Sequence, residues 1–294
     1  MGVFKKILHK GIIIRLVIVI VLSSVTGYFG AQFYINKFMK TVQAVTESEE
    51  DVRDDAEKIY FQSLGKTPAD FTPTQNFVIA EYLLNQQTSV KKTTTGSVTA
   101  AGVTQGLYAE KMLVDGEYYA MKISSGLVPL ATRTYYVSGS DTIDLYLGSD
   151  IKSDTATFGS SPDKQMTPDE FRELMGSKVT YFISYVVSSN SVEEEESLGL
   201  NEAGNYEFAL KLDTYFSCMN YSHEIKYTSD SPKLPEFTSV KIVFEIDKDW
   251  SLKRIDYDES YNVSVKQLGS MFVGTTGKIT DRFEVGGDYT IPRS

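Results

Sequence analysis

The chain has 294 residues, of which 39 are acidic and 29 are basic, and its formal net charge is −10 at pH 7. The first 40 residues hold six of the basic residues and none of the acidic ones, so residues 41–294 have 23 basic and 39 acidic side chains and a charge of −16. A domain this acidic repels phosphate backbones, which excludes nucleic acid as an expected partner. The single cysteine excludes an internal disulfide, so the stability of the domain must come from a packed core.

An uncharged apolar run covers residues 16–35, with the sequence LVIVIVLSSVTGYFGAQFYI. Twenty residues at about 1.5 Å rise each cross a hydrocarbon core of about 30 Å. Four basic residues precede the run, and positive flanks stay on the cytoplasmic side. The pattern predicts a cytoplasmic tail over residues 1–15, one transmembrane helix over residues 16–35 in the lipid bilayer, and a C-terminal domain outside the cell membrane.

A cleaved signal peptide is the alternative interpretation of this segment. Residues 25–27 form a poor cleavage site, because Tyr28 and Phe29 follow it directly. The apolar character also continues to Ile35, so we expect an uncleaved anchor. The only cysteine is Cys218, far from the membrane, which excludes a lipid anchor on a cysteine.

Residues 36–66 join the predicted membrane helix to the domain. Seven acidic residues crowd positions 47–57, and the apolar residues at helical spacing form a thin stripe. Such a stripe buries little surface. We therefore expect a solvated helical stalk, with an acidic recognition segment as the alternative.

Two helix starts mark the domain that we expect over residues 67–294. Thr72 precedes Pro73 and stands three residues before Gln75, which is typical of a capped helix that continues to about Gln87. The sequence Thr-Pro-Asp-Glu from Thr167 repeats this pattern, and Gly176 can end the second helix. Each helix precedes strands, so the domain is expected to have two halves of one helix and one meander, divided near residues 152–166.

Alternating apolar residues predict the strands. Asp115 and Gly116 separate two apolar runs, which is the strongest short signal of a hairpin. Further alternation covers residues 119–123, 143–147, 206–212, 240–246 and 255–265. About ten strands with short connections favour antiparallel meanders. The predicted class is α+β, with a large curved antiparallel sheet and two or three packing helices.

The last strands contain two irregularities. Trp250 and Leu252 share one phase and Ile255 and Tyr257 the other, so an extra residue must bulge near residues 253–254 if all four face inward.

Three polar residues also fall in apolar phases: Glu259 beside Tyr261, His223 beside Ile225, and Asp281 beside Phe283. They either line a cavity or are structural residues partnered by a neighbouring Arg or Tyr, and we expect Glu259 to pair with Arg254 or another base. The candidate ligand-binding residues are Glu259, Tyr257, Tyr261 and His223.

Residues for catalysis or for a cofactor are scarce. The two histidines are His9, on the predicted cytoplasmic side, and His223, which excludes a histidine-dependent triad or a histidine-rich metal site outside. Cys218 stands among apolar residues and is expected to be a small buried hydrophobe. The four glutamates at positions 193–196 lack the alternating ligands of a calcium loop, so we expect a solvated loop there. No catalytic residue, cofactor or metal is predicted, and the protein is not expected to be an enzyme.

The order of capped helix, meander, second helix and second meander resembles the lipoprotein-carrier fold over residues 70–290, in architecture only. That resemblance implies a curved half-barrel sheet. A second resemblance, to uncharacterised single-pass surface proteins of Gram-positive bacteria with no known activity, rests on residues 235–240 and on Phe244, Asp247, Trp250, Leu252, Glu259 and Tyr261 behind them.

The leading functional hypothesis is a membrane-anchored extracytoplasmic binding module that holds an apolar, lipid-like ligand or a partner segment on a curved sheet. The 19 tyrosines and 16 phenylalanines favour it, because aromatic side chains supply large contact areas. The alternative is an accessory protein that modulates an envelope complex such as a sensor kinase or a wall-synthesis enzyme. A third hypothesis is a hydrolase that uses unidentified carboxylates.

Overall fold

The computed structural model describes residues 53–125, 130–138, 142–147, 149–152, 155–176, 178, 181–229, 231–265 and 271–291. The predicted cytoplasmic tail, the predicted span at residues 16–35 and residues 36–52 of the predicted stalk lie outside these ranges. Within the described ranges, no helix has the length and apolar character needed to cross a membrane.

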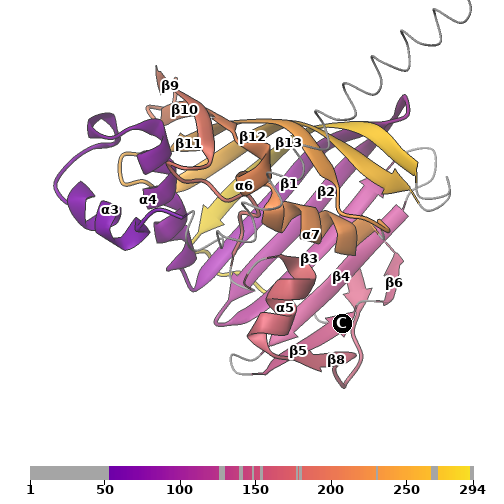
Figure 1. Ribbon diagram of the computed structural model, residues 1–294. Helices are drawn as coiled ribbons and strands as arrows, with labels where there is room; N and C mark the ends of the chain where they lie inside the picture. Colours follow the sequence, from indigo (N-terminus) through magenta and orange to yellow (C-terminus); the bar gives the residue numbers. More distant parts are fainter. Residues whose placement is uncertain are drawn as a thin grey trace, which may run out of the picture. The chain divides into compact units, whose positions relative to one another are not determined.

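Eleven strands of the described chain form one antiparallel sheet in the order β8-β5-β4-β3-β2-β1-β13-β12-β11-β10-β9 (Figure 1). Their bounds are Ser89–Ala100 for β1, Val103–Val114 for β2, Glu117–Ser125 for β3, Leu130–Ser138 for β4, Ile143–Leu147 for β5, Lys164–Met166 for β8, Val192–Leu200 for β9, Tyr206–Leu212 for β10, Glu236–Ile246 for β11, Leu252–Val265 for β12 and Met271–Val285 for β13. Two short strands, β6 (Ser149–Lys152) and β7 (Thr155–Thr157), form a separate pair. The predicted α+β class and the antiparallel sheet are confirmed.

The first and the last strands of the described sheet are neighbours at its centre. The first strand, β1, pairs along its length with the last described strand, β13. The strands β2 to β5 and β8 extend the sheet on one side of this pair, and β12 to β9 extend it on the other. Residues about 190 positions apart in the sequence therefore become direct neighbours in the middle of the sheet.

The described helices are α3 (Ala56–Ser63), α4 (Pro73–Asn85), α5 (Pro168–Met175), α6 (Thr214–Ser217) and α7 (Met219–Ser229), with a 3-10 turn at Pro68–Asp70. Helices α5, α6 and α7 lie over one face of the sheet (Figure 1), which we call the inner face. Both predicted capping boxes are present, at Thr72 with Gln75 and at Thr167 with Glu170. Gly176 ends α5 with φ 79°, as expected for a left-handed C-cap.

The predicted hairpin and bulge are also confirmed. Asp115 and Gly116 have φ values of 48° and 85° and join β2 to β3, as the type I′ turn requires. In the β11–β12 pair, Ile246 lies opposite Leu252 and Glu245 opposite Arg254, so one residue is extra between them. The bulge lets Leu252 and Ile255 both point to the buried side.

Aromatic packing joins α4 to the inner face. The ring of Phe244 lies 5.1 Å from Phe77 of α4 and 5.2 Å from Phe208 of β10, and all three are buried. Rings of this kind bury the largest areas in a core. This contact fixes α4 over the β10–β11 end of the sheet.

The described part of the predicted stalk packs on the domain. Tyr60 of α3 lies 5.2 Å from the ring of Tyr82 on α4. Asp54 accepts two hydrogen bonds from Ser189, at 2.8 and 2.5 Å. Arg53 also pairs with Glu81 of α4 at 3.5 Å, so the chain contacts the domain from the first described residue onward.

Two local predictions were wrong. Residues near His223 and Ile225 were expected to alternate as in a strand, but they form α7. The buried residues Cys218, Ser222 and Ile225 recur at intervals of four and three, which is the helical period. The second error concerns residues 193–196, which lie in β9 and not in a loop. Their side chains are exposed, β9 lies at the edge of the described sheet, and Lys211 pairs with Glu193 at 3.0 Å and Glu194 at 2.8 Å.

Candidate functional site

A cavity of about 70 Å³ lies between the inner face of the sheet and two covering elements. Strands β1, β2, β12 and β13 form its floor. Ser184 and Tyr185, from the loop before β9, and Tyr221 and Glu224, from α7, close it. We call residues 181–185 together with α7 the cover. A cavity of this size holds a few water molecules and is smaller than the about 300 Å³ of a typical small-molecule pocket.

The lining contains five ionisable side chains besides its tyrosines: Lys92, Lys111, Glu224, Glu259 and Asp281. Three of them are almost inaccessible, with exposed fractions of 6% for Lys92, 1% for Glu259 and 4% for Asp281. Burying charges in this way is expensive even when they are paired. Groups of buried ionisable residues in a cavity are therefore candidates for a functional site.

Lys92 and Asp281 form the ion pair at the centre of the floor. The Nζ atom of Lys92 donates to Asp281 Oδ2 at 2.9 Å and to the backbone oxygen of Phe182 at 2.8 Å. Thr94 and Tyr257 also donate to Asp281, at 2.5 and 3.3 Å. Burial lowers the pKa of Lys92, Asp281 opposes this change, and the neighbouring Lys111 adds to it.

Lys111 and Glu224 form the second ion pair, which joins the floor to the cover. The Nζ atom of Lys111 lies 2.9 Å from Glu224 Oε1, and the hydroxyl of Ser184 donates to the other carboxylate oxygen. Burial alone would raise the pKa of Glu224, but Lys111, Lys92 and Ser184 together outweigh it and lower this pKa to about 2. The Glu224 carboxylate is therefore ionised at neutral pH and holds α7 to β2.

Glu259 occupies space that a glycine leaves open. It lies opposite Gly277 of β13, where an added Cβ atom would approach Glu259 Oε1 to 2.6 Å. The hydroxyl of Tyr185, in the cover, donates to Glu259 Oε2. Glu259 thus connects the floor to the cover, as Lys111 does.

Three tyrosines surround these charges. The ring of Tyr185 stacks on Tyr257 at 5.3 Å and lies 4.9 Å from Tyr221. Burial raises the pKa of all three, and nearby carboxylates raise it further. Each phenol therefore keeps its proton at neutral pH and presents an apolar ring together with a hydrogen-bond donor.

The structure brings two of the four candidate ligand-binding residues to the cavity. Glu259 and Tyr257 are in its lining. Tyr261 lies farther along β12 and packs against Phe237 at 4.9 Å. His223 lies on α7 beside the end of α5, where a Cβ atom on Gly176 would come within 2.8 Å of it. Neither Tyr261 nor His223 lines the cavity.

Lys92, Lys111 and Glu224 were missed at the sequence level. Lys92 alternates with the buried Val90, and Lys111 with the buried Leu113, so both lysines fall in apolar phases as Glu259 does. That signal could have identified them. Glu224 could be placed only once residues 219–229 were recognised as a helix.

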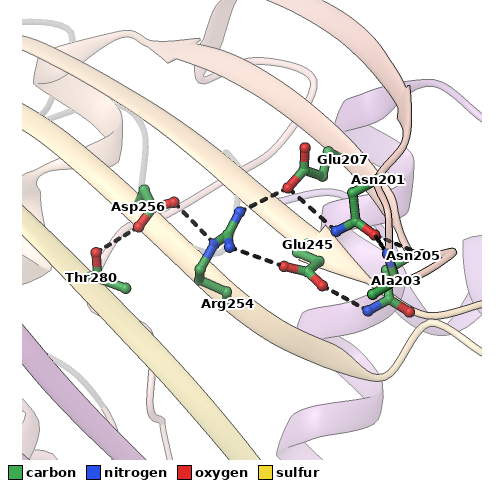
Figure 2. Close-up of polar contacts among 8 residues, drawn as sticks. All are labelled: Asn201, Ala203, Asn205, Glu207, Glu245, Arg254, Asp256 and Thr280. Atoms are coloured by element: carbon green, nitrogen blue, oxygen red, sulfur yellow. Dashed lines mark hydrogen bonds and ion pairs between the residues drawn. The ribbon is translucent and has the colours of Figure 1, made fainter.

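The expected pairing of Arg254 with Glu259 is wrong. They are five positions apart in one strand, an odd number, so their side chains point to opposite faces. Arg254 lies instead at the centre of an ion network on the outer face (Figure 2). Its guanidinium pairs with Glu207 at 2.7 Å, Asp256 at 3.0 Å and Glu245 at 3.3 Å.

Two further observations concern metal ligands and the single thiol. No group of three or more His, Cys, Asp or Glu side chains within the described ranges could hold a metal ion. Cys218 is buried, as predicted, and burial raises the pKa of its thiol. This raised pKa disfavours the reactive thiolate.

A second, larger cleft of about 430 Å³ lies between the start of α4 and the edge strand β9. Glu193, Glu194 and Glu195 line it together with Asp54. Glu195 accepts hydrogen bonds from the backbone and side chain of Thr74, at 2.9 and 2.6 Å. The cleft is therefore acidic.

No protein-family model matches the chain, and no curated protein matches it. The matching solved structures include LprF from Mycobacterium bovis, with 10% identity and a TM-score of 0.38 over 75% of this chain and 95% of that chain. A DUF1329 family protein from Desulfovibrio piger has 12% identity and a TM-score of 0.25 over 74% of this chain and 96% of that chain. A putative outer membrane lipoprotein-sorting protein domain from Vibrio parahaemolyticus has 10% identity and a TM-score of 0.24 over 73% of this chain and 93% of that chain. All three TM-scores are below 0.5, so the resemblance to the lipoprotein-carrier fold stays a prediction.

Proposed function

We propose that this chain is a membrane-anchored extracytoplasmic binding module that holds a ligand with an apolar part on the inner face of its sheet. One observation carries the proposal: five ionisable side chains and three tyrosines line one cavity between the sheet and the cover, and Lys92, Glu259 and Asp281 among them are buried. Apolar residues would serve stability better at these positions, because buried ion pairs contribute little net stability. A role in binding gives these residues a reason to be there, and it requires no catalytic group.

The cover must move for a ligand of lipid size to enter, because the cavity measures about 70 Å³. Polar contacts join the cover to the floor of the cavity. Lys92 bonds to Phe182, Lys111 to Glu224, and Glu259 to Tyr185. The rings of Tyr185, Tyr221 and Tyr257 would then contact the apolar part of the ligand.

Retention of lipid by the full-length chain tests this role. Native mass spectrometry after incubation with extracted membrane lipids should detect a bound species released with the protein. Ala109→Trp, which fills the cavity from β2, should abolish it. Ala209→Trp on β10, which does not line the cavity, is the matched control and should retain the ligand. Absence of bound lipid in every sample would contradict the proposal.

We further propose that residues 16–35 anchor the chain as a single-pass surface protein of a Gram-positive cell, with the domain outside. The basic N-terminus and the uncharged apolar run support this topology. Alkaline phosphatase fused after residue 66 should be active outside the cell, and the full-length chain should stay in the membrane fraction. Release of a fragment that begins near Tyr28 would favour the cleaved signal peptide.

A second candidate function is modulation of an envelope complex by direct contact. The exposed acidic edge strand β9 beside the 430 Å³ cleft favours it, because such an edge can pair with a strand of a partner. Replacing residues 16–35 with an unrelated transmembrane helix separates contact inside the membrane from contact outside. A phenotype that survives this exchange but is lost in Glu194→Lys would place the contact at β9.

A further inference from the structure

We propose that the ligand has an anionic head, a carboxylate or a phosphate, and that this head binds Lys111 in the place now held by Glu224. The inference rests on the proposed binding function of the inner face and adds the chemical class of the ligand. It assigns Glu224 the role of an internal anion that the ligand displaces.

Two lysines lie next to each other in the floor of the cavity. Lys92 of β1 and Lys111 of β2 lie directly opposite each other in the antiparallel pair. Both line the cavity, and the exposed fractions of their side chains are only 8% and 12%. Like charges placed opposite each other destabilise a sheet. Three carboxylates of the lining balance the two lysines: Asp281 pairs with Lys92, Glu224 pairs with Lys111, and Glu259 accepts a hydrogen bond from Tyr185.

The anionic partners of the two lysines lie on different parts of the domain. Asp281, which pairs with Lys92, belongs to β13 and is part of the sheet itself. Glu224, which pairs with Lys111, belongs to α7 and is part of the cover. When the cover moves away from the sheet, Lys92 keeps the Asp281 carboxylate, whereas the contact of Lys111 with Glu224 is broken and Glu259 loses the Tyr185 donor. An incoming anion would take the place of the Glu224 carboxylate on Lys111.

The Glu224 carboxylate indicates which head group could replace it. Glu224 offers two carboxylate oxygens, one bonded to Lys111 and the other to Ser184. A fatty acid or a phosphate monoester presents the same kind of acceptor oxygens at the end of an apolar chain. The rings of Tyr185 and Tyr221 lie beside this position and can contact the chain. The predicted ligand is therefore an anionic amphiphile.

Competitive photolabelling of the full chain in phosphatidylcholine nanodiscs tests the inference. The probes are a photoactivatable palmitic acid and its neutral amide, added in equal amounts at pH 8. The ratio of labelling by the acid to labelling by the amide is measured in peptides of the inner face and the cover. It is then divided by the same ratio in the remaining peptides. We expect a value of about ten in the wild type, given the strength of hydrogen bonds to charged groups. The charge of −16 on residues 41–294 acts against this preference, so general electrostatics cannot produce it.

Variants assign the preference to the ion pair. Lys111→Met should reduce the ratio to about one, and Glu224→Gln should raise it above the wild-type value because the competing carboxylate is gone. Lys91→Met, in the neighbouring β1 residue that pairs with Glu110 and lies outside the cavity lining, is the control and should leave the ratio unchanged. If Lys111→Met does not fold, the double variant Lys111→Met/Glu224→Gln, which removes both charges, should also give a ratio of about one.

The possible failures are distinguishable. Equal labelling by acid and amide in the wild type would overturn the anionic head and leave the proposed binding function intact. Absence of labelling of the inner face by either probe would overturn both. Loss of the acid labelling in excess inorganic phosphate would show that a free anion, and not an amphiphile, fills the site.

Discussion

The indole nitrogen of Trp250 donates a hydrogen bond to the side-chain oxygen of Asn76 at 2.7 Å, and both residues are buried. The amide nitrogen of Asn76 donates in turn to the backbone oxygen of Pro68 at 2.8 Å. One side chain thus joins the 3-10 turn, α4 and the turn between β11 and β12. These bonds hold the N-terminal helical segment against the sheet.

Asn76→Ala should therefore lower the free energy of unfolding by about 2 kcal/mol, because it leaves the buried indole N–H of Trp250 without its acceptor. Asn85→Ala, at the other end of α4 and only partly buried, is the matched control and should change it by less than about 0.5 kcal/mol. Urea unfolding can be followed by the fluorescence of Trp250, the only tryptophan. Equal midpoints for the two variants would contradict the prediction.

Gly277→Ala should destabilise the domain by about 1–3 kcal/mol, since the new Cβ atom would overlap the buried Glu259 side chain. Tyr185→Phe removes a donor from the same carboxylate and should cost about 1.5–3 kcal/mol. The two effects should not add, because displacement of Glu259 already weakens its bond to Tyr185. A double-mutant cycle measured by urea unfolding checks this. Strict additivity would show that the glycine and the tyrosine act independently.

Glu224 should make the stability of the protein fall in acid. Despite burial, which acts in the opposite direction, Lys111 and Lys92 lower its folded pKa to about 2, below its ordinary value of 4.5. A carboxyl of this kind contributes stability that is fully present above pH 5 and is lost as the pH falls from about 5 to about 2, in total about 3 kcal/mol. Unfolding free energies across this range should therefore decline less steeply in Glu224→Gln. The exposed Glu202→Gln should keep the wild-type slope; identical slopes in all three proteins would refute the assignment.

Arg254→Met should destabilise the domain by about 1–2 kcal/mol at low salt, because it leaves Glu207, Glu245 and Asp256 close together without their shared cation. The loss should shrink at high salt, which screens the repulsion between partly exposed carboxylates. Lys278→Met is the control, since its ion pair with Asp258 is long, at 3.9 Å, and exposed. Thermal melts at two salt concentrations give both comparisons. A loss that is independent of salt would instead indicate packing by the arginine stem.

The features that the sequence predicted correctly depend on residues close together in the chain. The capping boxes at Thr72 and Thr167 need three residues of separation, and the turn at Asp115 and Gly116 needs two. The bulge next to Leu252 was visible as a change of phase within one strand. Each of these structures is determined by local backbone geometry and by hydrogen bonds between near neighbours.

The candidate site depended on the tertiary structure. Alternation placed Glu259 on the buried face, but it could not choose between Arg254 and Tyr185 as its partner, since a period of two assigns a face and not a neighbour. Lys92 and Asp281 are 189 residues apart and meet only because β1 pairs with β13. Glu224 reaches Lys111 only because residues 219–229 fold as a helix over the sheet. The sequence by itself therefore determined the elements and their buried faces, whereas the order of strands and the packing of α7 decided which charges meet, because these contacts form between segments that no local interaction connects.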